Sequence, residues 1–150
     1  MLDPGDEAPP FELPNQDGDP VALSDFAGQR LVVYFYPRAD TPGCTIEARD
    51  FADHWDAFRD LDVAVVGISD DPVESQASFA EKYDLPFDLL SDEDGEVGRA
   101  YGSFGERTVG DREVTAAFRN TFVVGPDGTV EAVYRGVDPD GHAEELLSEL

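Results

Sequence analysis

Uncharged apolar runs alternate along the chain with segments in which apolar residues recur at helical spacing. Residues 31–36 form one such run, rich in Val, Tyr and Phe, which is typical of a strand buried on both faces. Residues 61–69 contain another. Between them, apolar side chains from Cys44 to Phe58 recur at steps of three or four residues, which predicts a helix over 42–60. Two strands joined by a helix form a βαβ unit, so we expect the strands to pair in parallel.

The remaining pattern predicts further elements of a mixed sheet. They are a short hairpin (11–13 with 21–23), helices at 71–83, 93–101 and 140–150, a strand at 86–90, a long loop at 102–113, and an antiparallel strand pair at 117–124 and 129–134. Helices on both faces of such a sheet place the chain in the α/β class. A length of 150 residues without linkers or repeats suits a single domain over 1–150.

The chain is strongly acidic and carries a large negative charge. Acidic residues outnumber basic ones by 34 to 10, the net charge is -24, and Lys82 is the only lysine. Such a charge repels nucleic acid and anionic membranes, so we expect neither as a partner. The acids are spread along the whole chain, which favours adaptation to a salt-rich cytoplasm over an acidic face for a basic partner. In molar salt the Debye length falls to about 3 Å, which screens most of the self-repulsion.

No stretch of the sequence is typical of a membrane or export segment. No apolar run approaches the roughly 20 residues of a membrane-spanning helix. Residues 1–6 have neither the basic region nor the apolar segment of a signal peptide. We therefore expect a cytoplasmic protein.

The segment that follows the 31–36 strand contains Cys44, the only cysteine of the chain. Pro37 ends the strand, Thr41 is a good N-cap residue, and Pro42 suits the first helical position. Cys44 therefore falls in the first helical turn, where free backbone N–H groups and the helix dipole favour an anion. Because the thiolate is the nucleophilic form of cysteine, this position indicates a reactive residue rather than a small buried apolar one.

The spacing of Pro37, Thr41 and Cys44 closely resembles the peroxidatic motif of the peroxiredoxins. The flanking residues 34–36 and 45–47 are similar to those of the Q-type branch, also called the bacterioferritin-comigratory type. The resemblance implies a thioredoxin-like fold. It also implies that Cys44 attacks a hydroperoxide, that Thr41 hydrogen-bonds the sulfur and the substrate, and that Pro37 shields the site.

Arg119 and Glu47 are further candidates for the site. Arg119 stands in the otherwise apolar segment 117–124, where an unpaired guanidinium would be costly to bury, so it needs an anion. The sequence alone leaves a structural ion pair open. Residues 119–122 resemble the strand that brings the family's arginine to the cysteine, which implies that Arg119 holds the thiolate and polarises the peroxide. Glu47 by itself would repel a thiolate, whereas the resemblance implies that it orients an arginine.

Other functions of a single cysteine need partners that the sequence does not place nearby. A cysteine hydrolase needs a histidine base, but His54 is ten residues further along the same predicted helix, about 15 Å from Cys44. His142 has no motif around it and is expected at the surface. A Cys-x-x-Cys oxidoreductase is excluded because residue 41 is Thr, and one cysteine with two distant histidines makes a poor metal site. A non-catalytic thioredoxin-fold binding or chaperone module remains the alternative.

The sequence thus predicts a thiol-dependent peroxidase that reduces hydrogen peroxide and organic hydroperoxides through a sulfenic acid at Cys44. No cofactor or metal is expected. Q-type members commonly carry a resolving cysteine five residues after the peroxidatic one, whereas this chain has Arg49 there and no other cysteine. We therefore expect an external thiol, from a thioredoxin-like protein or a small molecule, to recycle Cys44, and a transient disulfide between two Cys44 residues is the alternative route. The resemblance also implies a monomer or weak dimer.

Overall fold

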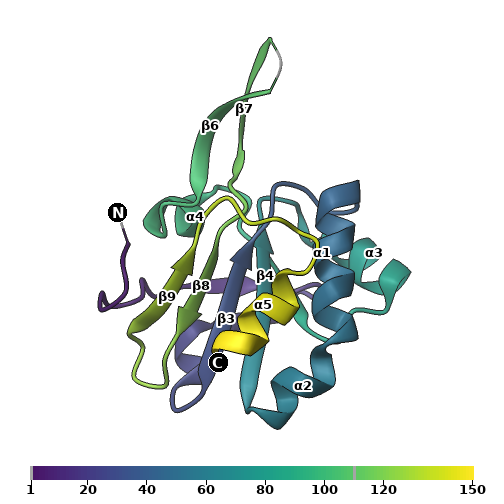
Figure 1. Cartoon of the computed structure of the whole chain (residues 1–150). Coiled ribbons are helices and arrows are strands. Elements are labelled where there is room, and N and C mark those ends of the chain that lie inside the picture. The colour runs from purple at the N-terminus through teal and green to yellow at the C-terminus, as the bar shows by residue number, and fades with distance from the viewer. Residues whose placement is uncertain (1, 110) are drawn as a thin grey trace.

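The sheet that organises the chain has five strands in the order β5-β4-β3-β8-β9 (Figure 1). The computed structural model describes residues 2–109 and 111–150. The five strands are β3 (Arg30–Phe35), β4 (Val63–Ser69), β5 (Asp88–Ser91), β8 (Thr121–Val124) and β9 (Val130–Tyr134). β4 pairs in parallel with β3 and with β5, whereas β8 is antiparallel to β3 and β9. The parallel pairing predicted from the βαβ pattern is confirmed.

Helices cover both faces of this sheet in unequal numbers. One face carries α1 (Pro42–Asp53), α2 (Trp55–Asp60), α3 (Val73–Tyr83) and α5 (His142–Glu149). The other carries α4 (Glu96–Ala100), the 3₁₀ turn η1 (Leu23–Phe26) and the small hairpin of β1 (Glu12–Pro14) and β2 (Pro20–Ala22). The predicted mixed sheet with helices on both faces is confirmed.

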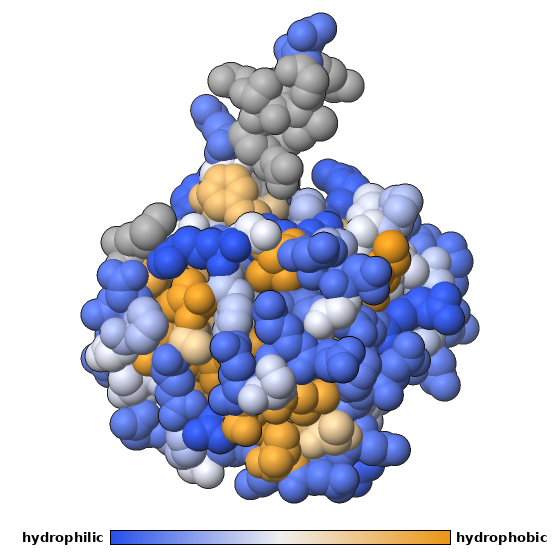
Figure 2. Space-filling view, viewed as in Figure 1, coloured by the Kyte–Doolittle hydropathy of each residue, from blue (hydrophilic) through white to orange (hydrophobic). Residues whose placement is uncertain are grey.

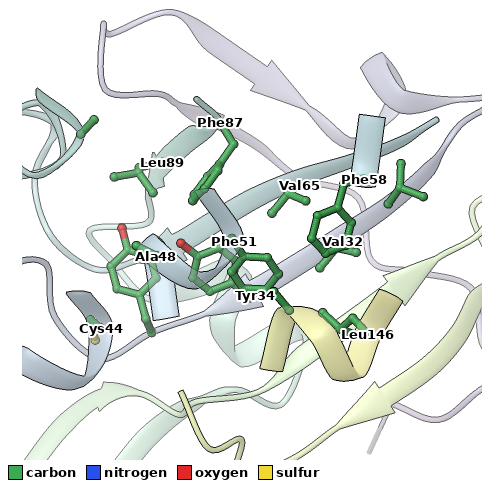
Figure 3. Close-up of a cluster of buried hydrophobic side chains, with 14 of the residues drawn as sticks. Val32, Tyr34, Cys44, Ala48, Phe51, Phe58, Val65, Phe87, Leu89 and Leu146 are labelled. Carbon is green, nitrogen blue, oxygen red and sulfur yellow. The ribbon is translucent and has the colours of Figure 1, made fainter. Parts of the chain in front are cut away.

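Alternate residues of β3 belong to two separate cores. Val32 and Tyr34 face α1, α2, α3 and α5, whereas Leu31 and Val33 face the opposite side. Because both faces are covered, the strand lacks the polar alternation of a half-exposed strand. The ring of Tyr34 stacks on Phe51 of α1 with the ring centroids 4.6 Å apart (Figure 3). This contact packs the helix that carries Cys44 onto the central strand.

The helix predicted over 42–60 is interrupted at His54. α1 ends at Asp53 and α2 begins at Trp55, with His54 at φ -104° and ψ 11° between them. Nδ1 of His54 lies 2.9 Å from the carbonyl oxygen of Asp50. The backbone N–H of His54 still donates to the same carbonyl at 3.2 Å, so the ring and the backbone share one acceptor where α1 ends. Both helices still pack on the same face of the sheet.

The segment predicted as a long loop, 102–113, forms a hairpin instead. β6 (Phe104–Val109) and β7 (Arg112–Ala117) pair antiparallel and project from the body of the protein (Figure 1). Its glycines suggested a loop, but the Thr and Val residues between them favour extended backbone, and the two strands satisfy each other's backbone groups. Gly110, which belongs to the predicted loop, lies outside the described residues.

Arg119 lies in the bend before a strand and not inside it, which corrects the strand predicted over 117–124. β7 ends at Ala117 and β8 begins only at Thr121. In this bend the carbonyl of Arg119 accepts the N–H of Val137 at 2.9 Å, so the backbone is bonded to the segment after β9. The apolar neighbours of Arg119 in the sequence therefore do not place its side chain within the sheet.

Polar residues cover most of the face shown in Figure 2, and apolar residues form separate patches on it. This distribution agrees with the acidic composition of the chain. Across residues 2–109 and 111–150, no helix combines the length and the apolar composition that crossing a membrane would require.

Candidate active site

The first turn of α1 presents Cys44. Thr41 has extended backbone angles (φ -94°, ψ 159°) and Pro42 begins the helix, as the sequence predicts. The N–H of Thr45 donates to the carbonyl of Thr41 at 2.8 Å. Cys44 is the third helical residue and is only 1% exposed. Its surroundings are therefore set by protein groups rather than by bulk water.

The guanidinium of Arg119 joins Cys44 to Glu47. Nη2 of Arg119 donates to the sulfur of Cys44 at 3.5 Å, and Nη1 donates to Oε1 of Glu47 at 2.9 Å. Cys44 and Glu47 are three residues apart on α1, so one face of the helix presents both groups to one cation. Gly43 leaves space for this cation, since a Cβ at that position would lie 3.0 Å from Nη2 of Arg119.

Glu47 is a buried carboxyl group close to its titration point at neutral pH. Burial raises the pKa of Glu47 to about 7, although the charge and the hydrogen bond of Arg119 act in the opposite direction. Its Oε2 atom has no hydrogen-bond partner among the residues that the structure describes. Burial lowers the pKa of Arg119, but Cys44 and Glu47 outweigh this effect and the pKa is raised. The guanidinium thus remains charged while Glu47 neutralises it only in part.

A cavity of about 560 Å³ opens beside this group. Pro37 and Arg119 line it, together with the apolar side chains of Phe118 and Val137. A second cavity, of about 630 Å³, lies between η1 and the turn after β8 and is lined by none of the predicted site residues. Of these two cavities, the one at Pro37 and Arg119 is lined by predicted site residues, and it reaches the group through Arg119 rather than through Cys44.

Thr41 is close in sequence to Cys44 but its hydroxyl group points elsewhere. Its Oγ1 donates to the carbonyl of Arg38 at 2.8 Å, which closes the turn before α1. The structure thus brings Cys44, Arg119 and Glu47 into direct contact. Pro37 lines the adjacent cavity, and the Thr41 hydroxyl is bonded to the Arg38 carbonyl within the loop.

His142 is buried, which corrects the expectation of a surface residue. It begins α5, is 2% exposed, and its Nε2 lies 2.9 Å from Oγ1 of Thr121 in β8. Burial lowers the pKa of His142, against the effect of Glu145. Within the described residues, neither His142 nor His54 bonds to Cys44, so a cysteine hydrolase would lack its base. Nor do three His, Cys, Asp or Glu side chains gather there as metal ligands.

The sequence analysis missed Asp71, which holds the loop before α1. Oδ2 of Asp71 accepts the N–H of Ala39 at 2.7 Å. In the sequence, Asp71 and Pro72 indicate only the start of a helix. No local pattern could connect Asp71 to a loop that precedes it by about thirty residues, because the parallel pairing of β3 and β4 creates the contact.

Known proteins are similar in sequence to this chain over almost its whole length. A putative peroxiredoxin of Mycobacterium tuberculosis is 45% identical over 149 residues, which cover 99% of this chain and 95% of that protein. Peroxiredoxin Bcp of Escherichia coli is 43% identical over 149 residues, which cover 99% of this chain and 96% of that protein. The sequence profile of the AhpC/TSA family matches residues 4–133. This chain is a peroxiredoxin of the AhpC/TSA family. The peroxiredoxin is of the Bcp/PrxQ type and is a thiol-dependent peroxidase.

Solved structures of similar peroxiredoxins have the same fold. Peroxidoxin BcpB of Mycobacterium tuberculosis matches with a TM-score of 0.88 and 38% identity, over 99% of this chain and 96% of that one. PrxQ of Xylella fastidiosa matches with a TM-score of 0.93 and 33% identity, over 99% and 95%. The predicted thioredoxin-like fold and the predicted peroxidase function are confirmed, and the family implies a peroxide substrate and a thiol reductant. The alternative of a non-catalytic thioredoxin-fold module does not describe this peroxiredoxin.

Proposed function

We propose that Cys44 is the peroxidatic residue and that Arg119 is its catalytic partner. The Cys44 thiolate attacks the terminal oxygen of the hydroperoxide, and the S–O bond forms as the O–O bond breaks. The departing oxygen takes up a proton and leaves as water or an alcohol, while Cys44 becomes a sulfenic acid. The 3.5 Å contact between Nη2 of Arg119 and the sulfur supports this most strongly, because the cation stabilises both the thiolate and the charge on the leaving oxygen.

Glu47, Thr41 and Pro37 have supporting roles in this proposal. Glu47 binds one nitrogen of Arg119 at 2.9 Å, which leaves the other directed at the sulfur. The Thr41 hydroxyl turns from the carbonyl of Arg38 to hydrogen-bond the sulfur and the bound peroxide. Pro37 shields the site from the side of the cavity that it lines with Arg119.

Both hydrogen peroxide and organic hydroperoxides are substrates in this proposal. The cavity beside Arg119 has apolar walls at Phe118 and Val137, which suit the carbon chain of an organic hydroperoxide. The bacterioferritin comigratory protein of Xanthomonas campestris, whose structures were analysed for its alkyl peroxide reduction activity, matches with a TM-score of 0.87 and 34% identity, over 93% of this chain and 88% of that one. That likeness supports the organic class of substrate.

An external thiol reduces the sulfenic acid in this proposal. Arg49 stands on α1 where Q-type members commonly carry a resolving cysteine, and the chain contains no second cysteine. An intramolecular disulfide is therefore impossible. A thioredoxin-like protein or a small thiol attacks the sulfur, forms a mixed disulfide with Cys44 and releases water, and a second thiol then restores Cys44.

Excess peroxide without a thiol donor is expected to oxidise Cys44 beyond the sulfenic acid. Without an internal thiol to trap that acid, Cys44 should proceed to the sulfinic and sulfonic acids, and activity should fall during turnover. Mass spectrometry of the peptide that contains Cys44 should show gains of one, two and three oxygen atoms. Pretreatment with an alkylating reagent provides the control and should prevent the gains. Quantitative conversion to a disulfide-linked dimer, without oxygen adducts, would contradict the external-thiol route.

We also propose that this peroxiredoxin works as a single domain, as a monomer or weak dimer, in a salt-rich cytoplasm. One sheet shared by two buried cores supports the single domain. The net charge of -24, spread along the chain, supports the salt-rich environment, since concentrated ions screen repulsion among the acids.

The melting temperature is expected to climb as KCl rises from millimolar to molar concentration. The physical reason is screening of the net charge of -24, because the Debye length shrinks to about 3 Å at 1 M salt. Circular dichroism during heating would measure the change, and NaCl at equal ionic strength should have the same effect. A melting temperature that stays constant or falls as KCl rises would contradict the proposed salt adaptation.

A further inference from the structure

The loop between β3 and α1, residues 37–41, is fastened to a buried carboxylate. Oδ2 of Asp71 accepts the backbone N–H of Ala39 and the hydroxyl of Ser69, each at 2.7 Å. Asp71 is 6% exposed and Ser69 is 1% exposed, so little water competes for these bonds. The loop leads directly into the helical turn of Cys44. Any displacement of Ala39 therefore shifts the segment that positions the sulfur.

Gln76 of α3 supports the Asp71 carboxylate indirectly, through Ser69. Its Nε2 donates to Oγ of Ser69 and to the carbonyl of Leu90, each at 2.9 Å, and its Oε1 accepts the hydroxyl of Tyr36. Burial raises the pKa of Tyr36, so its hydroxyl keeps the proton that it donates. Gln76 is fully buried and both ends of its amide are bonded. A fully satisfied buried network of this kind strongly favours one arrangement.

A second attachment of the same loop lies at the surface. Asp40 has φ of 60°, a left-handed conformation that is strained for a residue with a side chain, so contacts must hold it. Its carboxylate accepts bonds from Nζ of Lys82 and from the hydroxyl of Tyr83, each at 3.0 Å. Lys82, the only lysine in the chain, is more than half exposed at its side chain. Salt should weaken this exposed pair far more than the buried bonds of Asp71.

We propose that Asp71 is a positioning residue for the peroxide reaction. Through Ala39 it holds the 37–41 loop, and thereby the first turn of α1, in the position where Cys44 meets Arg119. The exposed pair of Lys82 and Asp40 assists only at low ionic strength. This inference rests on the proposed roles of Cys44 and Arg119, but the hold on the loop can be measured independently of peroxide chemistry.

The test compares oxidation and alkylation of Cys44 in Asp71→Asn. A neutral amide is a weaker acceptor for two donors than a carboxylate, so the second-order rate constant for single-turnover oxidation by hydrogen peroxide should fall about tenfold. Alkylation of reduced Cys44 by a bulky maleimide should accelerate, because access limits a sulfur that is 1% exposed. Both changes should persist in molar KCl. Lys82→Gln should likewise slow the oxidation and accelerate the alkylation of Cys44, but only at low salt.

Asp92→Asn is the matched control. Asp92 is another buried carboxylate, 4% exposed, that accepts backbone N–H groups, from Val97 at 3.2 Å and Gly98 at 2.8 Å. These donors belong to α4, on the opposite face of the sheet from α1. The control should lower the melting temperature without changing either rate constant for Cys44.

Three results would overturn the positioning role of Asp71. The first is a folded Asp71→Asn variant with both rates unchanged, and the second is an Asp92→Asn variant that reproduces its effects. If Asp71→Asn does not fold, Ser69→Ala removes the second donor to Oδ2 of Asp71, and unchanged rates in that variant would overturn the proposal instead. A wild-type protein that alkylates slowly yet consumes no peroxide would contradict the roles of Cys44 and Arg119. The alkylation rates of the variants would still show whether Asp71 holds the loop.

Discussion

Cys44→Ser is expected to reduce peroxide consumption to the background rate. The serine hydroxyl is almost entirely protonated at neutral pH and is a far weaker nucleophile than a thiolate. The chain has no other cysteine that could substitute for Cys44. Consumption of hydrogen peroxide with dithiothreitol as the thiol donor would measure the loss.

The fold of this variant should be intact, because the exchange of sulfur for oxygen removes little volume at a single buried site. Its melting temperature and its circular dichroism spectrum should therefore match those of the wild type. Thr45→Ser, in the same helical turn, is a suitable control and should retain the normal rate. Appreciable turnover by Cys44→Ser would rule out Cys44 as the peroxidatic residue.

Arg119→Ala is expected to lower the rate constant for Cys44 oxidation by about 10² or more, because it removes a cation aimed at developing charge. The variant also leaves Glu47 buried without its partner, so this carboxyl should become protonated. Single-turnover oxidation of reduced protein by hydrogen peroxide, measured by rapid mixing, would report the rate constant directly.

Arg119→Lys distinguishes charge from geometry in the same assay. A lysine keeps the charge but cannot bind Cys44 and Glu47 with two nitrogens of one plane, so an intermediate rate is expected. Arg30→Ala is the control, since Arg30 forms an exposed pair with Glu131 at 2.6 Å. Its removal should leave the rate unchanged. A near-normal rate in Arg119→Ala would assign Arg119 to a structural ion pair.

Elements with long, unbroken patterns were predicted well from the sequence. The uncharged run at 31–36 forms β3 from Arg30 to Phe35, with Tyr36 just beyond its end, and the apolar residues at helical spacing form the inward faces of α1 and α2. The hairpin of β6 and β7 was predicted wrongly as a loop, because glycine is a local signal while strand pairing is a contact between segments. The break at His54 escaped prediction for a similar reason, since it involves a side chain bonded to a carbonyl.

Some features of the candidate site could likewise be predicted from the local sequence, and others could not. Cys44 and its place in the first helical turn could be predicted because Pro37, Thr41 and Pro42 determine where the strand ends and the helix begins. The contact of Arg119 with Cys44 was expected only from the family resemblance. It requires a bend before β8 that the apolar pattern around Arg119 did not predict.

Local chemistry along the sequence by itself determined the α/β class, the single cysteine, the helix start that places Cys44 in the first turn, and the acidic character of the chain. Only the tertiary structure decided the distances and the burial. It placed Arg119 between Cys44 and Glu47, fastened the 37–41 loop to Asp71, and buried His142, the first residue of α5, against Thr121 of β8. The physical reason is that propensities and capping act within a few residues, whereas these contacts join segments from separate strands and helices that meet only after the sheet has assembled.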